Sequence, residues 1–340
     1  MPSRVVYVGS GAVGQAKVSN SPVFGKLAVP TEERAAIVNL TVDEELGTLA
    51  VFRVEEQPFH VGWLVPRPLN GHLYGVGGGK AHSWAAGGDG SLTLTSSSDT
   101  AGGSAFLELS CDGRWALSAR LAVLPISLNG ALGMATCVKM HSLQLNPTLA
   151  DRQEGCHPHQ IRLDPHTNKW ALSCDLGASR VWVYSFDSVT GTLVGEADSP
   201  RHLLLPESAG PRHLDFHPSG RWVYILCELD GCLVVCDWDA EAGRLSPKQT
   251  LCACAPLWER ARGGLDGWWS GFRVQPDGQC AKSLRSRPYR WHLAEVPGRA
   301  CQHARCLPSE FFIGGLDVSW RGGAGPQPGL TKCRLLSDGP

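Results

Sequence analysis

The sequence predicts an all-β fold, a seven-bladed β-propeller in which residues 1–340 form a single domain. Three observations lead to this prediction: a segment repeated almost whole, a closing turn that recurs at a nearly constant spacing, and short runs in which apolar and polar residues alternate. Alternation with a period of two indicates β-strands, and no segment has the longer apolar period of an amphipathic helix.

The clearest repeat lies between residues 155 and 245. Each copy has a Gly/His opening, a strand, a Pro-centred turn, a strand that begins with Trp, an acidic loop, a third strand and a closing Asp-x-x-x-Gly-x-Leu turn. Trp170 and Trp222 align with a period of 52 residues. A unit of about fifty residues with four short strands is typical of a propeller blade.

The closing turn extends the repeat beyond these two copies. Its glycines average 49 residues apart and stand at Gly47, Gly90, Gly130, Gly191 and Gly243. Glycine suits tight hairpins because it adopts positive φ without steric cost. Five units are visible in this way, and the ends of the chain leave room for two more.

The repeat pattern fails after about Gln279. Alternation becomes weak, basic residues interrupt every run, and the closing turn does not return. The last blades are either divergent, or residues from about 280 onward come from a shifted reading frame or an altered exon; the second explanation is preferred. We therefore expect blades after about residue 280 to be degenerate or incomplete.

Composition narrows the function classes. The formal net charge is −1, which gives no electrostatic basis for binding nucleic acid or a membrane surface. The N-terminus lacks the apolar core of a signal peptide, and no apolar run is long enough to cross a bilayer. The 13 cysteines, an odd number, fit buried thiols in a reducing compartment. We expect a cytoplasmic protein without a nucleic-acid or membrane partner; the sequence does not indicate its oligomeric state.

Four motifs in order make this chain similar to a known family. They are His157-Pro158-His159, the segment from Asp175 to Val181, Gly210-Pro211-Arg212-His213 and Cys227-Glu228-Leu229. In these motifs the chain resembles the seven-bladed propeller lactonases, which include propeller-type 6-phosphogluconolactonases and the 3-carboxy-cis,cis-muconate lactonizing enzyme. The resemblance is strong over residues 155–250, moderate over 36–154 and very weak beyond 280.

The resemblance implies a cleft at one mouth of the central channel with His159, Arg212 and Glu228 as catalytic residues. Lactone hydrolysis needs a base near water and a positive group near the carbonyl oxygen. His159 suits a general base or acid, and Arg212 suits an anion binder or oxyanion stabiliser. Glu228 suits an orienting carboxylate or an alternative base. The sequence does not settle these roles.

Three further residues are candidates for substrate binding: His157, Asp175 and Arg285. Asp175 has an alternative role as the cap of its own turn, and the two histidines could simply bond backbone carbonyls. A His-x-His pair can also bind metal, but no third ligand has supporting spacing, so we expect no metal and no other cofactor. Arg285 lies near the place of an arginine that the family supplies, in a segment of uncertain register.

Three departures from the family pattern put catalysis in question, and the uncertain register around Arg285 is one of them. Phe106 stands where the family usually has a histidine, and Gly77-Gly78-Gly79 replaces a segment that often reads Asn-Glu. Three functions therefore compete: a lactonase acting on 6-phosphogluconolactone or a related sugar lactone, a carboxymuconate-type cycloisomerase, and a non-catalytic propeller that serves as a binding scaffold or is defective.

Overall fold

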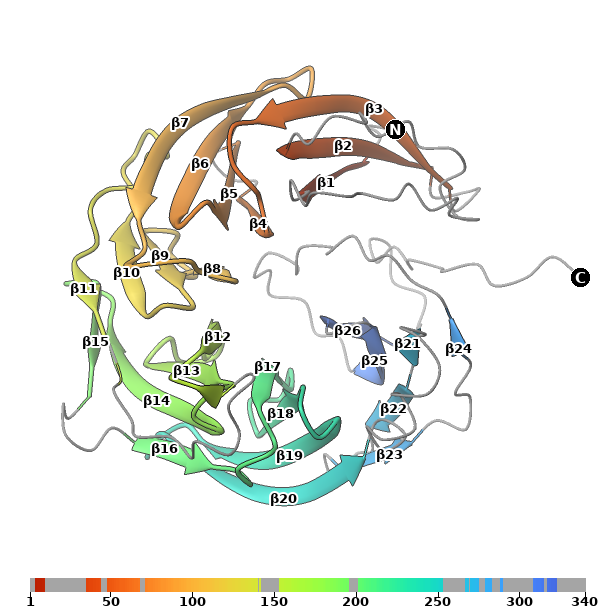
Figure 1. Ribbon diagram of the computed structural model, residues 1–340. Helices are drawn as coiled ribbons and strands as arrows, with labels where there is room; N and C mark the ends of the chain where they lie inside the picture. Colours follow the sequence, from red (N-terminus) through yellow and green to blue (C-terminus); the bar gives the residue numbers. More distant parts are fainter. Residues whose placement is uncertain are drawn as a thin grey trace, which may run out of the picture.

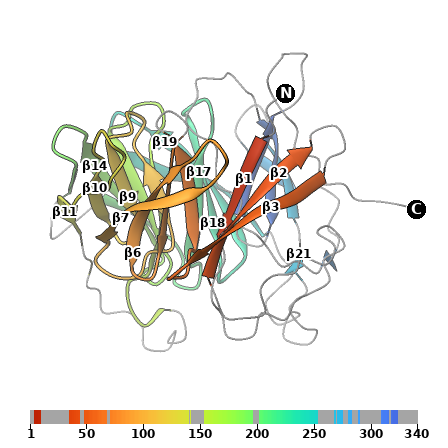
Figure 2. The same cartoon turned by 90° about the horizontal axis from the view of Figure 1, so that it is seen from above.

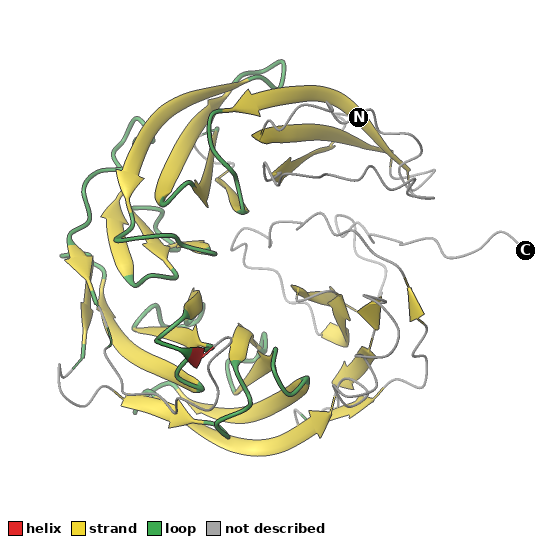
Figure 3. Cartoon of the chain, in the orientation of Figure 1, coloured by secondary structure: helices red, strands yellow, loops and turns green. Residues whose placement is uncertain are grey.

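The computed structural model describes residues 4–9, 35–43, 48–67, 71–139, 141, 153–195 and 201–252, with shorter segments at 267–268, 270–274, 279–282, 288–289, 308–314 and 317–322. These residues form antiparallel sheets placed side by side around a common axis (Figure 1; Figure 2 is turned by 90°). Almost all of them are strands and loops (Figure 3). The all-β propeller prediction is confirmed.

The first five sheets follow one another along the chain, and within each the strands pair in sequence order. The first contains β1 (Arg4–Gly9), β2 (Ala35–Asp43) and β3 (Thr48–Gln57). The second contains β4 (Trp63–Arg67), β5 (His72–Gly77), β6 (Lys80–Ala86) and β7 (Leu92–Asp99). The third contains β8 (Leu107–Leu109), β9 (Trp115–Ser118), β10 (Ala122–Pro125) and β11 (Cys137–Val138).

The fourth and fifth sheets are the repeated segment itself. The fourth contains β12 (Pro158–Leu163), β13 (Trp170–Asp175), β14 (Arg180–Asp187) and β15 (Thr192–Val194), and β16 (Arg201–Leu204) also pairs with β14. The fifth contains β17 (Pro211–Phe216), β18 (Trp222–Cys227), β19 (Cys232–Asp239) and β20 (Arg244–Cys252). The first strand of each sheet lies nearest the axis in Figure 1.

The C-terminal strands pair in a different order. They are β21 (Gly267–Trp268), β22 (Ser270–Val274), β23 (Cys280–Lys282), β24 (Pro288–Tyr289), β25 (Pro308–Gly314) and β26 (Asp317–Gly322). One sheet has the order β23-β22-β25-β26, and β21 pairs with β24 separately. This departure from sequence order agrees with the expectation of degenerate blades in this part of the chain.

The recurring tryptophans and closing glycines meet between neighbouring blades. The Trp115 indole donates to the Ser188 carbonyl at 2.8 Å, and the Trp170 indole donates to the Ala240 carbonyl at 2.7 Å. A Cβ at Gly191 would lie 2.1 Å from the Trp115 ring, so no larger residue fits there without movement. The tryptophan and the closing glycine, which both mark the repeat in the sequence, therefore contact each other across neighbouring blades.

The core consists of apolar layers between adjacent sheets. All six residues of β13 are buried, and so are all six of β18, because a neighbouring sheet covers each face. Buried clusters join the second to fourth sheets and the fourth to fifth sheets. The inner strands β12 and β17 nevertheless carry buried polar side chains, among them Gln160 and His213.

Candidate active site

His159 and Arg212 occupy the same position in successive blades. β12 has a bulge between Pro158 and Gln160, and β17 has a bulge between Pro211 and His213. The extra residue of a bulge is released from the regular alternation of the strand, which re-aims its side chain. Both predicted residues are therefore set apart by a local irregularity at the start of an innermost strand.

Arg212 is held by two partners. Its Nη1 forms an ion pair with Glu228 Oε2, and its Nε donates to His213 Nε2 at 3.3 Å. The side chains of Arg212 and Glu228 are each 16% exposed, so water screens this pair only in part. Glu228 follows β18, and its backbone N–H donates to the Gly210 carbonyl at 2.8 Å. These two interactions orient the guanidinium of Arg212. They involve only Nη1 and Nε, so they do not use the other N–H groups of the fork.

His213 links Arg212 to His159. The rings of His159 and His213 lie 5.2 Å apart between centroids, edge to face. His213 is buried, and burial lowers its pKa well below the ordinary value, with the charges of His159, Arg212 and Arg162 acting in the same direction. The ring is therefore neutral at neutral pH. Because Nε2 accepts from Arg212, the ring proton sits on Nδ1.

Asp175 supports the site from behind rather than facing it. The residue is fully buried at the end of β13. Its Oδ1 accepts from the backbone N–H of His157 at 2.7 Å and of Ala178 at 3.0 Å, and its Oδ2 accepts from the Trp182 indole at 3.0 Å. The structure thus favours the capping role over substrate binding, and the cap holds the backbone that leads into His159.

The remaining two predicted residues are not part of this cluster as described. His157 is exposed on its side chain and pairs through Nε2 with Glu154 Oε1 at 2.9 Å. Arg285 lies outside the described residues. The structure therefore brings together three of the predicted residues, His159, Arg212 and Glu228, through His213. The sequence signal for His213 was its place at the end of the Gly-Pro-Arg-His motif.

Two of the three departures from the family pattern have clear structural consequences. Phe106 is buried and packs against Trp63 at 4.3 Å between ring centroids, with His213 at 6.4 Å from Phe106. The apolar pair of Phe106 and Trp63 therefore borders the His213 imidazole. A Cβ at Gly77 would lie 1.5 Å from the His60 carbonyl oxygen, so this backbone admits no asparagine there.

A charged cluster that the motifs did not indicate lies on the same inner strands. Arg162 of β12 contacts Glu108 of β8 and Asp215 of β17. Burial raises the pKa of Glu108 to about 7, opposed by the positive charge of Arg162 and reinforced by Asp215. A carboxyl that titrates near neutral pH beside a candidate site is a frequent feature of functional centres.

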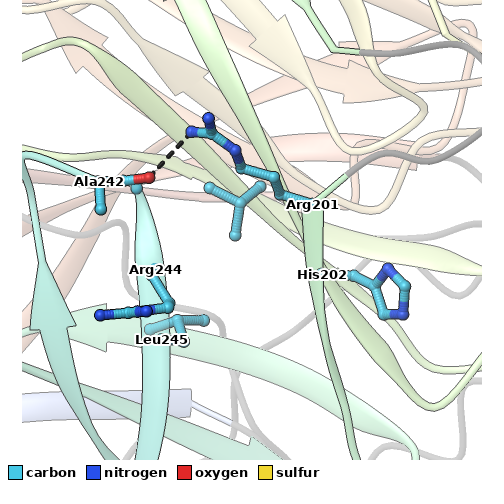
Figure 4. Close-up of a pocket in the computed structure, with 7 residues that line it drawn as sticks. Arg201, His202, Ala242, Arg244 and Leu245 are labelled. Atoms are coloured by element: carbon cyan, nitrogen blue, oxygen red, sulfur yellow. Dashed lines mark hydrogen bonds between the residues drawn. The ribbon is translucent and has the colours of Figure 1, made fainter.

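The cavity in Figure 4 lies elsewhere, at the outer strands β16 and β20. It measures about 370 Å³, and its lining residues are Val183, Arg201, His202, Ala242, Gly243, Arg244 and Leu245. Arg201 there donates to the Ala242 carbonyl at 2.9 Å and stacks on Trp170, so its charge is already engaged in joining two blades. None of the motif residues lines this cavity.

Neither a metal centre nor a membrane-spanning helix is present among the residues that the structure describes. No group of three or more His, Cys, Asp or Glu side chains there could hold a metal ion. No helix among these residues is long and apolar enough to cross a membrane.

The class of this protein is a β-propeller in which His159 and Arg212 lie on innermost strands and Glu228, which follows β18, pairs with Arg212. The family described as lactonase, 7-bladed beta-propeller matches residues 26–282, more than half of the chain. The chain belongs to this family. The match ends close to where the repeat pattern fails.

The chain is similar to curated relatives over part of their length. A 6-phosphogluconolactonase of Pectobacterium carotovorum is 30% identical over 240 residues, which cover 68% of this chain and 66% of the relative. One of Pectobacterium atrosepticum is 31% identical over 241 residues, 68% of this chain and 65% of the relative. The matched region thus spans slightly less than two thirds of these relatives.

Solved structures show the same fold. The periplasmic gluconolactonase of Pseudomonas aeruginosa has a TM-score of 0.64 at 23% identity, covering 84% of this chain and 83% of that chain. A Bacteroides uniformis protein has a TM-score of 0.69 at 20% identity, covering 94% and 100%. At these identities the similarity concerns the fold alone.

Proposed function

We propose that this protein hydrolyses a sugar lactone, with 6-phosphogluconolactone as the first substrate to test. The observation that carries the proposal is the cluster of Arg212, Glu228, His213 and His159 at the inner strands, in a chain of the lactonase family. The relatives named 6-phosphogluconolactonase support the choice of substrate.

The cluster suits the chemistry of water attack on an ester carbonyl. His159 is partly exposed on its bulge, and in this proposal it takes a proton from the attacking water. Arg212, oriented by Glu228 and His213, donates to the carbonyl oxygen as it gains negative charge, or holds an anionic group of the substrate. The C–O bond of the ring then breaks, and the leaving oxygen takes the proton back from His159, giving the open hydroxy acid.

Glu228 is assigned an orienting role because its described partner is Arg212. A carboxylate paired with a guanidinium is a weak base but fixes the plane of the fork. The alternative, in which Glu228 is the base, predicts a larger loss of activity for Glu228→Gln than for His159→Gln.

A second candidate function rests on Phe106. This buried ring immediately precedes β8, where the resemblance places a histidine, and with Trp63 it makes one side of the cluster apolar. Such a surface suits a propeller that binds its ligand without catalysis.

The test is a direct assay of the purified full chain on freshly prepared 6-phosphogluconolactone, with acid release compared with the spontaneous rate. The expected result is hydrolysis above that rate and a loss of about 100-fold or more in His159→Gln and Arg212→Met. Arg114→Met is the matched control, because it removes an exposed ion pair to Asp112 at 2.7 Å. It should keep wild-type activity.

Two further arms separate the alternatives. Gluconolactone without phosphate tests whether Arg212 recognises the anionic group, since loss of phosphate recognition would appear in KM. Loss of the absorbance of 3-carboxy-cis,cis-muconate would indicate the cycloisomerase. A wild-type rate equal to the spontaneous rate on every substrate would overturn the proposal and leave the binding scaffold.

A further inference from the structure

Three ionisable side chains from three different blades meet on the inner strands. Arg162 Nη1 lies 3.4 Å from Glu108 Oε2, and Arg162 Nη2 lies 3.0 Å from Asp215 Oδ1. The three side chains are only 20–25% exposed. Arg162 therefore spans β8, β12 and β17 with separate nitrogens of one planar fork.

Glu108, Arg162 and Asp215 form a charged layer around the axis. This layer lies next to a second one that contains His213. Side chains two residues apart along a strand point to the same face. Asp215 follows His213 at that spacing within β17. Arg162 likewise follows Gln160, whose Oε1 accepts from the Leu214 backbone N–H and so joins β12 to β17. The two layers are thus stacked along the axis and tied across blades.

Arg162 also lowers the pKa of the His213 imidazole in the neighbouring layer. Burial is the main reason that the pKa of His213 is low, and the positive charge of Arg162 lowers it further, together with His159 and Arg212. A neutral His213 can accept from Arg212 Nε, whereas a protonated one could only repel it. A fixed cation one layer away therefore favours the hydrogen bond that orients Arg212.

We propose that Arg162 is a positioning residue of the candidate active site: its bridge to Glu108 and Asp215 holds β8, β12 and β17 in register and keeps His213 an acceptor for Arg212. This proposal rests on the proposed function for its kinetic readout. It assigns a role to three residues, Glu108, Arg162 and Asp215, that carry none of the family motifs.

A general contribution to stability does not account for this arrangement. Poorly exposed ion pairs often contribute little net stability, because desolvation offsets the attraction. The chain also contains a peripheral counterpart: Arg53 lies 3.4 Å from Glu55 and 3.0 Å from Asp89. That cluster has the same distances, but it lies on outer strands and turns of the first two sheets.

The experiment compares Arg162→Met and Arg162→Lys with the control Arg53→Met. We measure kcat and KM on 6-phosphogluconolactone, and we follow the His213 titration by NMR of 15N-histidine-labelled protein, assigned with His213→Gln. Arg162→Met should lower kcat/KM about tenfold or more and raise the pH at which His213 titrates. Arg53→Met should change neither.

The lysine variant separates charge from geometry. Arg162→Lys keeps the positive charge, so the His213 titration should stay near that of the wild type. An ammonium group has no fork to span both carboxylates, so kcat/KM should recover only in part.

If Arg162→Met does not fold, Glu108→Gln/Arg162→Met/Asp215→Asn removes every charge of the cluster and leaves none unpaired. It should show the same two changes. Wild-type kinetics and an unchanged His213 titration in Arg162→Met, or in the triple variant, would overturn the proposal. If the wild type has no lactonase activity, the proposed function fails, while the His213 titration still tests the positioning role.

Discussion

Replacing Asp175 by asparagine tests whether this buried carboxylate is a structural cap. In Asp175→Asn, the remaining oxygen can still accept from the backbone N–H groups of His157 and Ala178. The amide NH2 would then face the Trp182 indole N–H, which now donates to Oδ2 at 3.0 Å. A hydrogen bond to a charged group contributes about 1.5–3 kcal/mol, and a buried donor left unpaired costs a further 1–3 kcal/mol. We expect a loss of about 3 kcal/mol in the free energy of unfolding.

Urea unfolding followed by tryptophan fluorescence measures this loss. Asp187→Asn is the matched control, because Asp187 caps an exposed turn by accepting from the Val189 backbone N–H at 2.8 Å, where water can replace the bond. It should cost less than about 1 kcal/mol. The loss in Asp175→Asn should shrink in a Trp182→Phe background, since the conflicting donor is then absent. A free energy of unfolding equal to that of Asp187→Asn, with a raised KM, would instead indicate that Asp175 binds substrate.

Three other substitutions have expected outcomes that the same unfolding assay checks. Gly177→Ala should cost more than about 3 kcal/mol, because its Cβ would lie 1.8 Å from the Gly155 carbonyl oxygen; a loss below 1 kcal/mol would contradict this close approach. Burial lowers the pKa of His217 to about 4, so the wild type should lose up to about 3 kcal/mol as pH falls from 6.5 to 4, and His217→Asn should not. The pKa of Glu108 is raised to about 7, so the folded state holds this proton where the unfolded state has lost it. The Glu108 contribution should therefore decline by up to about 3 kcal/mol as pH rises from 4.5 to 7, and Glu108→Gln should remove that slope.

The fold was predictable because each blade repeats the same local sequence pattern. Turn glycines, a strand that begins with Trp, and alternating apolar residues recur about every fifty residues, and each can be recognised within one blade. What the sequence did not indicate is that Trp115 packs on Gly191 and Trp170 on Gly243. Those contacts join neighbouring blades, and a one-dimensional pattern does not state which copies touch.

The candidate site was predictable in part. Motifs led to His159, Arg212 and Glu228. The structure places His159 and Arg212 on inner strands, with His213 in contact with both, and Glu228 after β18, paired with Arg212. The same motifs made Asp175 a candidate for binding substrate, whereas its oxygens are occupied by three N–H donors inside the blade. An aspartate that caps a turn and one that binds a ligand look alike until their partners are known.

The C-terminal part of the chain needs a separate test. The family match ends at residue 282, and Arg285 lies outside the described residues. Translating the gene in the other frames past codon 279 distinguishes the two explanations for the lost pattern. Text resembling Tyr-Val-Ser-Asn-Arg in another frame would support a shifted frame, and its absence would support divergence.

The sequence by itself determined the kind of blade, its spacing and the three motif residues. Each of these depends on short sequence patterns that can be recognised without the structure. Only the tertiary structure decided that β8, β12 and β17 meet near one axis, so that Glu108, Arg162 and Asp215 form a single charged layer. These residues stand about one repeat apart on the first strands of successive blades, but the repeat does not state that their side chains contact one another. Their contact exists because side-by-side packing of the sheets turns the first strand of each blade toward the same place.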